Sequence, residues 1–241
     1  MILVLALTAA ELTELEDARL ADLGQQPVTQ RSATALQARR SLVARGLLDT
    51  GGGLPVDDSD ESLLLTTVLD VRLTATRSLA VERVVASGPQ GFVRGVRLVH
   101  LLDDDEGAVV EDVLEDDVRH LWLAPAQRQV VEAVTSVTVP AAAVPGCGGP
   151  RSVRSGDPEA LASTLDHPTV LAELTVVESG DPVSAELVAL GPRGCWSAHI
   201  DRSEEPPGVL EFLPVPPGQV AAWVGAAARP GGGTRQGTMT R

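Results

Sequence analysis

The chain has 241 residues, of which 44% are hydrophobic and only 2% are aromatic, and its formal net charge is −14. This length suffices for one large or two small domains. The negative charge disfavours nucleic acids and anionic membrane surfaces as partners. Two cysteines are too few for a disulfide framework, and no apolar run approaches the ~20 residues that span a bilayer. We therefore expect a cytoplasmic protein with free thiols.

Residues 1–53 are expected to form a short lead-in or strand followed by a pair of helices. The run Thr8-Ala9-Ala10-Glu11 matches a capping box, which predicts a helix from there to about Leu23. A second helix is predicted over residues 33–45, where Gly46 ends it. This helical pair precedes the rest of the fold.

Residues 54–136 are predicted to form a first unit of one helix, four antiparallel strands and a closing helix. The helix covers residues 61–69, and alternating apolar and polar residues over 70–78 predict the first strand. The closing helix opens at Pro125 and runs to about Ser136. The three further strands are expected at residues 92–102, 108–114 and 118–123.

A second unit with the same plan is predicted over residues 157–228. The Pro- and Gly-rich residues 137–156 are interpreted as a linker between the units, with strand character at 137–139. A helix is expected at 158–165, and another follows Pro216-Pro217. The strands of this unit are expected at residues 169–177, 183–190, 195–200 and 209–213. Residues 229–241 are expected to be disordered.

The two units also resemble each other in sequence. The run Val-Arg-His-Leu-Trp-Leu-Ala-Pro from Val118 and the run Val-Leu-Glu-Phe-Leu-Pro-Val-Pro from Val209 each precede a helix. Internal repetition of this kind predicts an α+β fold of two pseudo-symmetric helix–four-strand–helix units, with antiparallel sheets flanked by helices. Joining the two sheets around a pseudo-twofold axis would remove one edge from each.

No group of residues in the sequence predicts catalysis. None of the four histidines pairs with another His or Cys at metal-ligand spacing. Cys195 and His199 fall on one predicted strand roughly 13 Å apart, which is beyond hydrogen-bond reach. The G-x-S-x-G, P-loop and Rossmann motifs do not occur. We therefore expect no enzyme, no metal and no cofactor.

The run Ala-Arg-Gly-Leu-Leu-Asp at residues 44–49, then a Gly-rich turn and a Leu-rich helix leading into Val71-Arg72-Leu73, resembles the start of an EspG-family protein. The linker leading to Arg151-Ser152-Val153 and the duplicated plan are similar to the centre of that family, so the resemblance covers most of residues 8–228. EspG-family proteins are cytosolic chaperones of type VII secretion in actinobacteria, which cap the hydrophobic tip of helical PE–PPE pairs. The resemblance implies an antiparallel sheet flanked by helical bundles, no enzymatic activity, and a PE/PPE-like or WXG100-like helical secretion substrate as partner.

A partner surface is predicted on the first sheet. If one face of that sheet is uncovered, the tip of a substrate helix can rest across it, with arginines at its rim. Core packing is the alternative for each apolar residue of this set, and a solvated strand position is the alternative for each arginine. The candidate partner-binding residues are Arg72, Phe92, Arg94, Val96, Leu98 and Trp122. The predicted function is a non-enzymatic EspG-like chaperone that acts as a monomer or weak dimer.

A locally basic window supports a second hypothesis. Between Asp22 and Asp49 the chain has four arginines and no acidic residue. This pattern is consistent with a winged-helix-type DNA-binding regulator that uses residues 8–50, and a solvated helix face explains it more simply. The arginines are Arg31, Arg39, Arg40 and Arg45.

Overall fold

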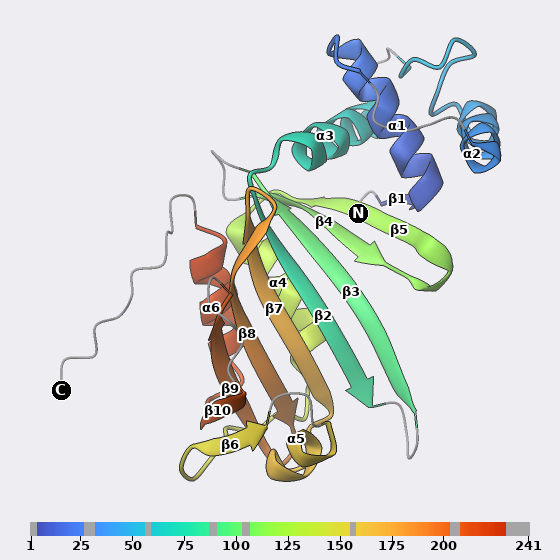
Figure 1. The fold of residues 1–241 in the computed structure, drawn as a ribbon. Helices are drawn as coiled ribbons and strands as arrows, with labels where there is room; N and C mark the ends of the chain where they lie inside the picture. The colour runs from blue at the N-terminus through green and yellow to red at the C-terminus, as the bar shows by residue number, and fades with distance from the viewer. Residues whose placement is uncertain are drawn as a thin grey trace. The chain divides into compact units, whose positions relative to one another are not determined.

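The computed structural model describes residues 4–26, 32–55, 59–86, 91–102, 107–154, 158–202 and 208–229. It divides into two compact units (Figure 1). Unit 1 comprises Met1–Ala75 and Val109–Leu123, and unit 2 comprises Thr76–Ala108 and Ala124–Arg241. The mixture of helices and antiparallel strands confirms the α+β class. Most of the segment predicted to be disordered lies outside the described residues.

The predicted helical pair of unit 1 is confirmed. Helix α1 spans Ala9–Asp22 and helix α2 spans Ala33–Ala44, and the two pack against each other. The Thr8 hydroxyl accepts a hydrogen bond from the backbone N–H of Glu11, whose carboxylate accepts one from the backbone N–H of Thr8. This reciprocal pair is the predicted capping box. Gly46 has a φ of +73°, the left-handed conformation that favours glycine after a helix.

Helix α3 spans Asp60–Thr74, so the strand predicted over residues 70–78 is wrong. Val68, Leu69 and Val71 are all buried, which shows that the apolar stripe follows the helical period beyond the expected helix end. The alternating residues at 71–76 are too few to outweigh the packing of this stripe, and α3 packs against α1. The strand that follows, β2 (Arg77–Ala86), begins where the predicted strand was expected to end.

Three strands belong wholly or mainly to unit 1. These are β1 (Leu5–Thr8), β4 (Ala108–Val113) and β5 (Val118–Ala124). Strand β1 pairs with β5 in antiparallel fashion. A short 3-10 turn at Glu115–Asp117 precedes β5. The predictions of strands at 108–114 and 118–123 are therefore confirmed.

Unit 2 contains strands in the order β3-β2-β7-β8-β9-β10-β6. Each printed pair of neighbours is antiparallel, as the short predicted turns require. The hairpin turn predicted between β8 and β9 is confirmed, because Gly191 lies opposite Gly194. The bounds are β3 (Phe92–Leu101), β6 (Arg151–Arg154), β7 (Val170–Glu178), β8 (Asp181–Gly191), β9 (Gly194–Asp201) and β10 (Val209–Pro214). The helices of this unit are α4 (Gln127–Thr138), α5 (Pro158–Thr164) and α6 (Gln219–Ala227).

The segment predicted as a linker, residues 137–156, packs into unit 2. The strand character expected at 137–139 is wrong, because α4 continues to Thr138 with Val134 buried one turn earlier. Residues 151–154 form β6, which pairs with β10. Between these elements the backbone passes so close to β9 that a Cβ on Gly146 would lie 2.1 Å from the carbonyl oxygen of Cys195.

The two faces of the sheet in unit 2 differ in their cover. Helices α4 and α6 contact each other and lie behind the sheet in Figure 1. The buried residues of these two helices include Val130 and Val134 on α4 and Val220 and Val224 on α6. On the opposite face, α5 and β6 contribute to a core cluster with Trp196 and Phe212. That cluster covers the β8–β10 end of the face.

Candidate functional site: a groove on the open face of unit 2

The strand register determines which side chains share the open face. Directly opposite residues of antiparallel strands point to the same side of a sheet. Glu82 on β2 lies opposite Val96 on β3 and opposite Glu173 on β7. The next pair of positions on this face brings Arg94 opposite Val84. The register therefore gathers residues of four strands, since Leu187 on β8 lies opposite Glu173 in turn.

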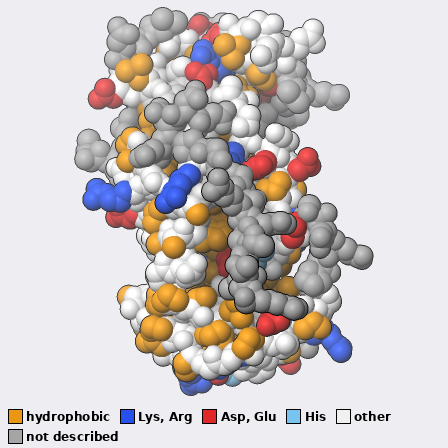
Figure 2. All heavy atoms as spheres, turned by 90° about the vertical axis from the view of Figure 1, so that its left-hand side faces the viewer, with side chains coloured by type: hydrophobic (Ala, Val, Ile, Leu, Met, Phe, Trp, Pro, Cys, Tyr) orange, Lys and Arg blue, Asp and Glu red, His pale blue; other side chains and the backbone are white. Residues whose placement is uncertain are grey.

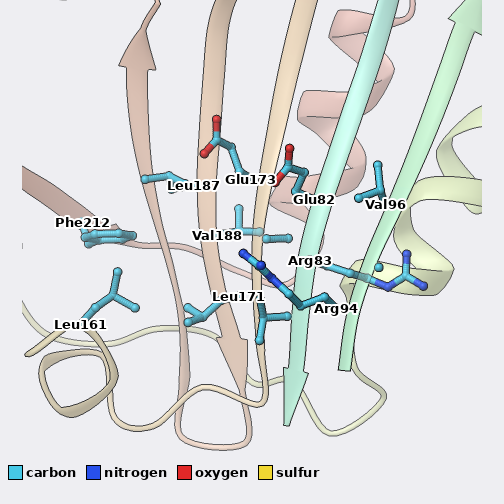
Figure 3. A pocket seen from close by; sticks show the side chains of 13 residues that line it. Glu82, Arg83, Arg94, Val96, Leu161, Leu171, Glu173, Leu187, Val188 and Phe212 are labelled. Atoms are coloured by element: carbon cyan, nitrogen blue, oxygen red, sulfur yellow. The ribbon is translucent and has the colours of Figure 1, made fainter. Parts of the chain in front are cut away.

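These residues line a groove of about 410 Å³. Its apolar floor comes mainly from Val84, Val96, Leu171 and Leu187, and Figure 3 shows Leu161 of α5 and Phe212 of β10 at one end. A groove of this volume is large enough to accept several apolar side chains or a small molecule.

Two carboxylates stand side by side at one border of the groove (Figure 3). Glu173 accepts hydrogen bonds from Arg202 and from the hydroxyl of Thr175, the latter at 3.0 Å. Glu82 is exposed and forms no hydrogen bond or ion pair with any described residue. Glu82 therefore presents a negative charge with which no described residue pairs, directly opposite the like charge of Glu173.

The groove also carries a positive charge, that of Arg94. Arg94 is exposed, and its guanidinium extends over the apolar floor in Figure 3. No described residue forms a hydrogen bond or ion pair with it. The neighbouring Arg83 occupies the other face, where its guanidinium carbon lies 2.9 Å from the position that a Cβ on Gly95 would take. The two arginines therefore have different surroundings, since only the Arg94 guanidinium extends over the groove floor in Figure 3.

Four of the six predicted partner-binding residues lie on strand β3. Phe92, Arg94, Val96 and Leu98 occupy alternate positions, so all four share the open face. Phe92 is 73% exposed, while Val96 and Leu98 are half-buried. Arg94 and Val96 line the groove itself.

The other two predicted residues lie in unit 1. Arg72 was expected at the rim beside a strand, but it belongs to α3, where its guanidinium donates to Glu16 at 2.8 Å and also to Glu111. Trp122 is half-buried in β5. The predicted rim of Arg72 and Arg94 is thus divided between two units. The error at Arg72 follows from the strand assignment to residues 70–78.

Sequence reasoning missed the residues that the second half of the chain contributes. Leu171, Glu173 and Leu187 reach the groove because β2 pairs with β7, about ninety positions later in the chain. The available signal was the alternation of β7, whose buried and partly exposed positions follow each other regularly. This pattern predicts two faces, and it does not predict which strand lies alongside.

Two of the four arginines in the basic window of the DNA-binding hypothesis form contacts within unit 1. Arg39 donates a hydrogen bond to the carbonyl oxygen of Gly51 at 2.8 Å. Arg45 lies 3.2 Å from the Glu11 carboxylate. Arg40 is exposed, and Arg31 lies outside the described residues. Arg45 therefore joins the end of α2 to α1, whereas Arg39 joins α2 to the turn that follows it.

Cys195 and His199, which the sequence places on one strand, have different surroundings. Cys195 is fully buried on β9, and this burial raises the pKa of its thiol. His199, on the same strand, is exposed and lies 3.3 Å from the Glu186 carboxylate. Both cysteines, Cys147 and Cys195, are free. In the described part of the chain, no three His, Cys, Asp or Glu residues are grouped so that they could hold a metal ion.

Hydrophobic side chains also gather on the side of unit 2 that Figure 2 shows, where α6 and β10 lie in Figure 1. On β10, Val209 and Leu213 are exposed. Single exposed apolar residues are common on protein surfaces. No helix among the described residues has the length and apolar character needed to cross a bilayer. The chain matches no protein-family model and no curated protein sequence.

Proposed function

We propose that this protein is a non-enzymatic binding protein that shelters an apolar surface of a helical partner, as an EspG-like chaperone for a type VII secretion substrate. The observation that carries this proposal is the open groove of about 410 Å³ with an apolar floor and a charged border. Apolar surface rimmed by polar groups is typical of protein-binding sites. Phe92, 73% exposed beside this groove, would bury its ring against the partner.

The arrangement suits a chaperone for physical reasons. Burial of apolar surface drives association by roughly 25 cal/mol per Å², and it removes from water the surface through which the partner would aggregate. A sheet supported from behind by α4 and α6 offers this surface with little rearrangement, which lowers the entropic cost of binding. The protein would act in the cytoplasm as a monomer or weak dimer, before export of the partner.

We also propose that the two helix–four-strand–helix repeats are related by pseudo-twofold symmetry. Strand β2 is the first strand of one repeat and β7 is the first strand of the other, and they pair in antiparallel fashion. Two equivalent antiparallel strands side by side are compatible with a twofold axis between them. The groove crosses this seam, because Val96 comes from the first repeat and Leu171 from the second. One partner would therefore contact both repeats.

The test is co-expression with a helical protein encoded beside this chain's gene. We expect the partner to be soluble and to co-purify with the wild-type chain, and to aggregate when expressed alone. Val96→Asp should abolish co-purification, because it places a charge on the groove floor. The matched control is Val209→Asp, at a 58% exposed position on β10, which should leave co-purification intact. A partner that is equally soluble without this chain would contradict the proposal.

A further inference from the structure

We infer that the segment held in the groove is an amphipathic helix of about 13 residues, which presents one basic and one acidic side chain, one helical turn apart, to Glu82 and Arg94. The inference rests on the proposed function, in which a helical partner occupies the open face. It adds the length of the bound segment and the charges that select it.

The length follows from the apolar positions along β3. Phe92 and Leu98 lie six residues apart on the open face, which corresponds to roughly 20 Å at about 3.3 Å per residue. A helix rises about 1.5 Å per residue, so a segment of about 13 residues covers this distance. A small ligand confined to the groove would leave the exposed ring of Phe92 uncovered.

The width of the open face also suits a helix. Strands β3, β2, β7 and β8 contribute to the groove, and neighbouring strands lie about 4.8 Å apart. The face is therefore roughly 14 Å wide between the axes of its outer strands, and a helix with its side chains is about 10 Å across. A single helix fits this width, and Leu161 and Phe212 close the groove at its end, as Figure 3 shows.

The charges follow from Glu82 and Arg94, with which no other residue of the described ranges forms a hydrogen bond or ion pair. Arg94 lies opposite Val84, two positions along β2 from Glu82, so Glu82 and Arg94 are diagonal neighbours on adjacent strands. Such neighbours lie about 7–8 Å apart, close to the spacing of about 6 Å between residues one turn apart on a helix. A helix with a base and an acid one turn apart can therefore satisfy both groups at once, while its apolar stripe contacts Val96 and Leu171.

The test uses the full chain and three synthetic 14-residue peptides that share one Leu stripe. At two flanking positions one turn apart, the peptides carry Lys and Glu, Lys and Lys, or Glu and Glu. The Lys/Lys and Glu/Glu peptides present the same pair of charges in either direction of binding, whereas the Lys/Glu peptide can match Glu82 and Arg94 in one direction. Binding is measured by fluorescence anisotropy at low ionic strength, where exposed charges are least screened.

We expect the wild-type chain to prefer the Lys/Glu peptide by about three- to tenfold, as rim ion pairs allow. Glu82→Arg should shift the preference to the Glu/Glu peptide, and Arg94→Glu should shift it to the Lys/Lys peptide. The matched controls are Glu211→Arg on β10 and Arg154→Glu on β6, both at exposed positions, which should keep the wild-type order. Circular dichroism spectra like that of the wild type would show that all four variants fold.

Equal affinity of the wild-type chain for the three peptides would overturn the inference, as would an unchanged order in Glu82→Arg and Arg94→Glu. Absence of binding by all three peptides would overturn it too. Binding of palmitate that Val96→Asp abolishes, without peptide binding, would assign the groove to a small apolar ligand instead. The proposed function is judged separately by partner solubility, so binding that ignores charge would remove this inference alone.

Discussion

The guanidinium of Arg151 lies over the indole ring of Trp196, with its central carbon 3.7 Å from the ring centroid. Trp196 is fully buried on β9, whereas Arg151 belongs to the short strand β6. The same guanidinium donates to the carbonyl oxygen of Thr164 at 2.5 Å and to the Asp166 carboxylate at 2.7 Å. One side chain therefore links β6, the sheet and the end of α5, the helix that contributes Leu161 to the groove.

Replacing Arg151 with Ala should lower the free energy of unfolding by about 2 kcal/mol, because a cation–π contact and charge-assisted hydrogen bonds are lost together. The measurement is urea denaturation of the variant and the wild type. The control is Arg154→Ala on the same strand, where the side chain is exposed and the expected change is within about 0.5 kcal/mol. Equal losses in the two variants would show that the contact with Trp196 adds nothing.

Glu111 is the buried centre of an ionic network in unit 1. Its side chain is fully buried on β4, and it accepts hydrogen bonds from Arg119 at 2.8 Å and from Arg72. Glu111→Gln removes the buried charge that Arg72 and Arg119 share, although Arg72 keeps Glu16 and Arg119 keeps Asp117 as partners. Because two charge-assisted hydrogen bonds to a buried carboxylate are weakened together, we expect a loss of about 3 kcal/mol in the free energy of unfolding. Glu14→Gln, a half-buried position on α1, is the control and should change stability little. The comparison is made by thermal denaturation at neutral pH.

Glu11 should make the stability of unit 1 dependent on pH. Burial opposes its ionisation, but hydrogen bonds from Ser41 and Thr8 and the charge of Arg45 outweigh this effect and hold its pKa below the ordinary value. A lowered pKa in the folded state stabilises the protein above the ordinary glutamate pKa of about 4.3, and this stabilisation is lost as the pH falls through the folded-state value.

The measurement is the difference in unfolding free energy between the wild type and Glu11→Gln as a function of pH. The difference should stay constant from pH 7 to about 5 and shrink below about 4.3, because the wild-type carboxyl then becomes protonated. A difference that grows as the pH falls would contradict this assignment of the Glu11 pKa.

Gly146 should not tolerate a side chain. A Cβ there would lie 2.1 Å from the carbonyl oxygen of Cys195 and 2.9 Å from the Cα of Pro214, and both are backbone atoms that cannot rotate away. We expect Gly146→Ala to lower the free energy of unfolding by about 2 kcal/mol or more. Gly149→Ala, where nothing lies within 4 Å of the added carbon, is the control. Urea denaturation that shows equal stability for the two variants would contradict the close packing of this segment.

Local signals in the sequence predicted the elements whose determinants lie within a few residues. The capping box at Thr8 and Glu11 begins α1 as expected, and Gly46 follows α2 in the left-handed conformation. The turn between Gly191 and Gly194 forms the expected hairpin. In each case the side chain or backbone freedom that determines the structure acts over one turn of chain.

The errors arose where two local patterns competed. Residues 70–78 alternate as a strand does, yet Leu69 and Val71 continue the buried stripe of α3. The segment 137–156 has the composition of a linker, yet it contains β6. This strand forms because β10 supplies its hydrogen-bond partners, which the composition of the segment does not reveal. Packing against distant elements decided both cases.

Of the candidate site, the sequence by itself determined that Phe92, Arg94, Val96 and Leu98 share one face of a strand, because alternation along β3 has a period of two. Only the tertiary structure decided that this face borders an open groove and that β7 lies beside β2. Pairing across about ninety residues depends on hydrogen bonds and side-chain packing between segments that carry no local mark of each other.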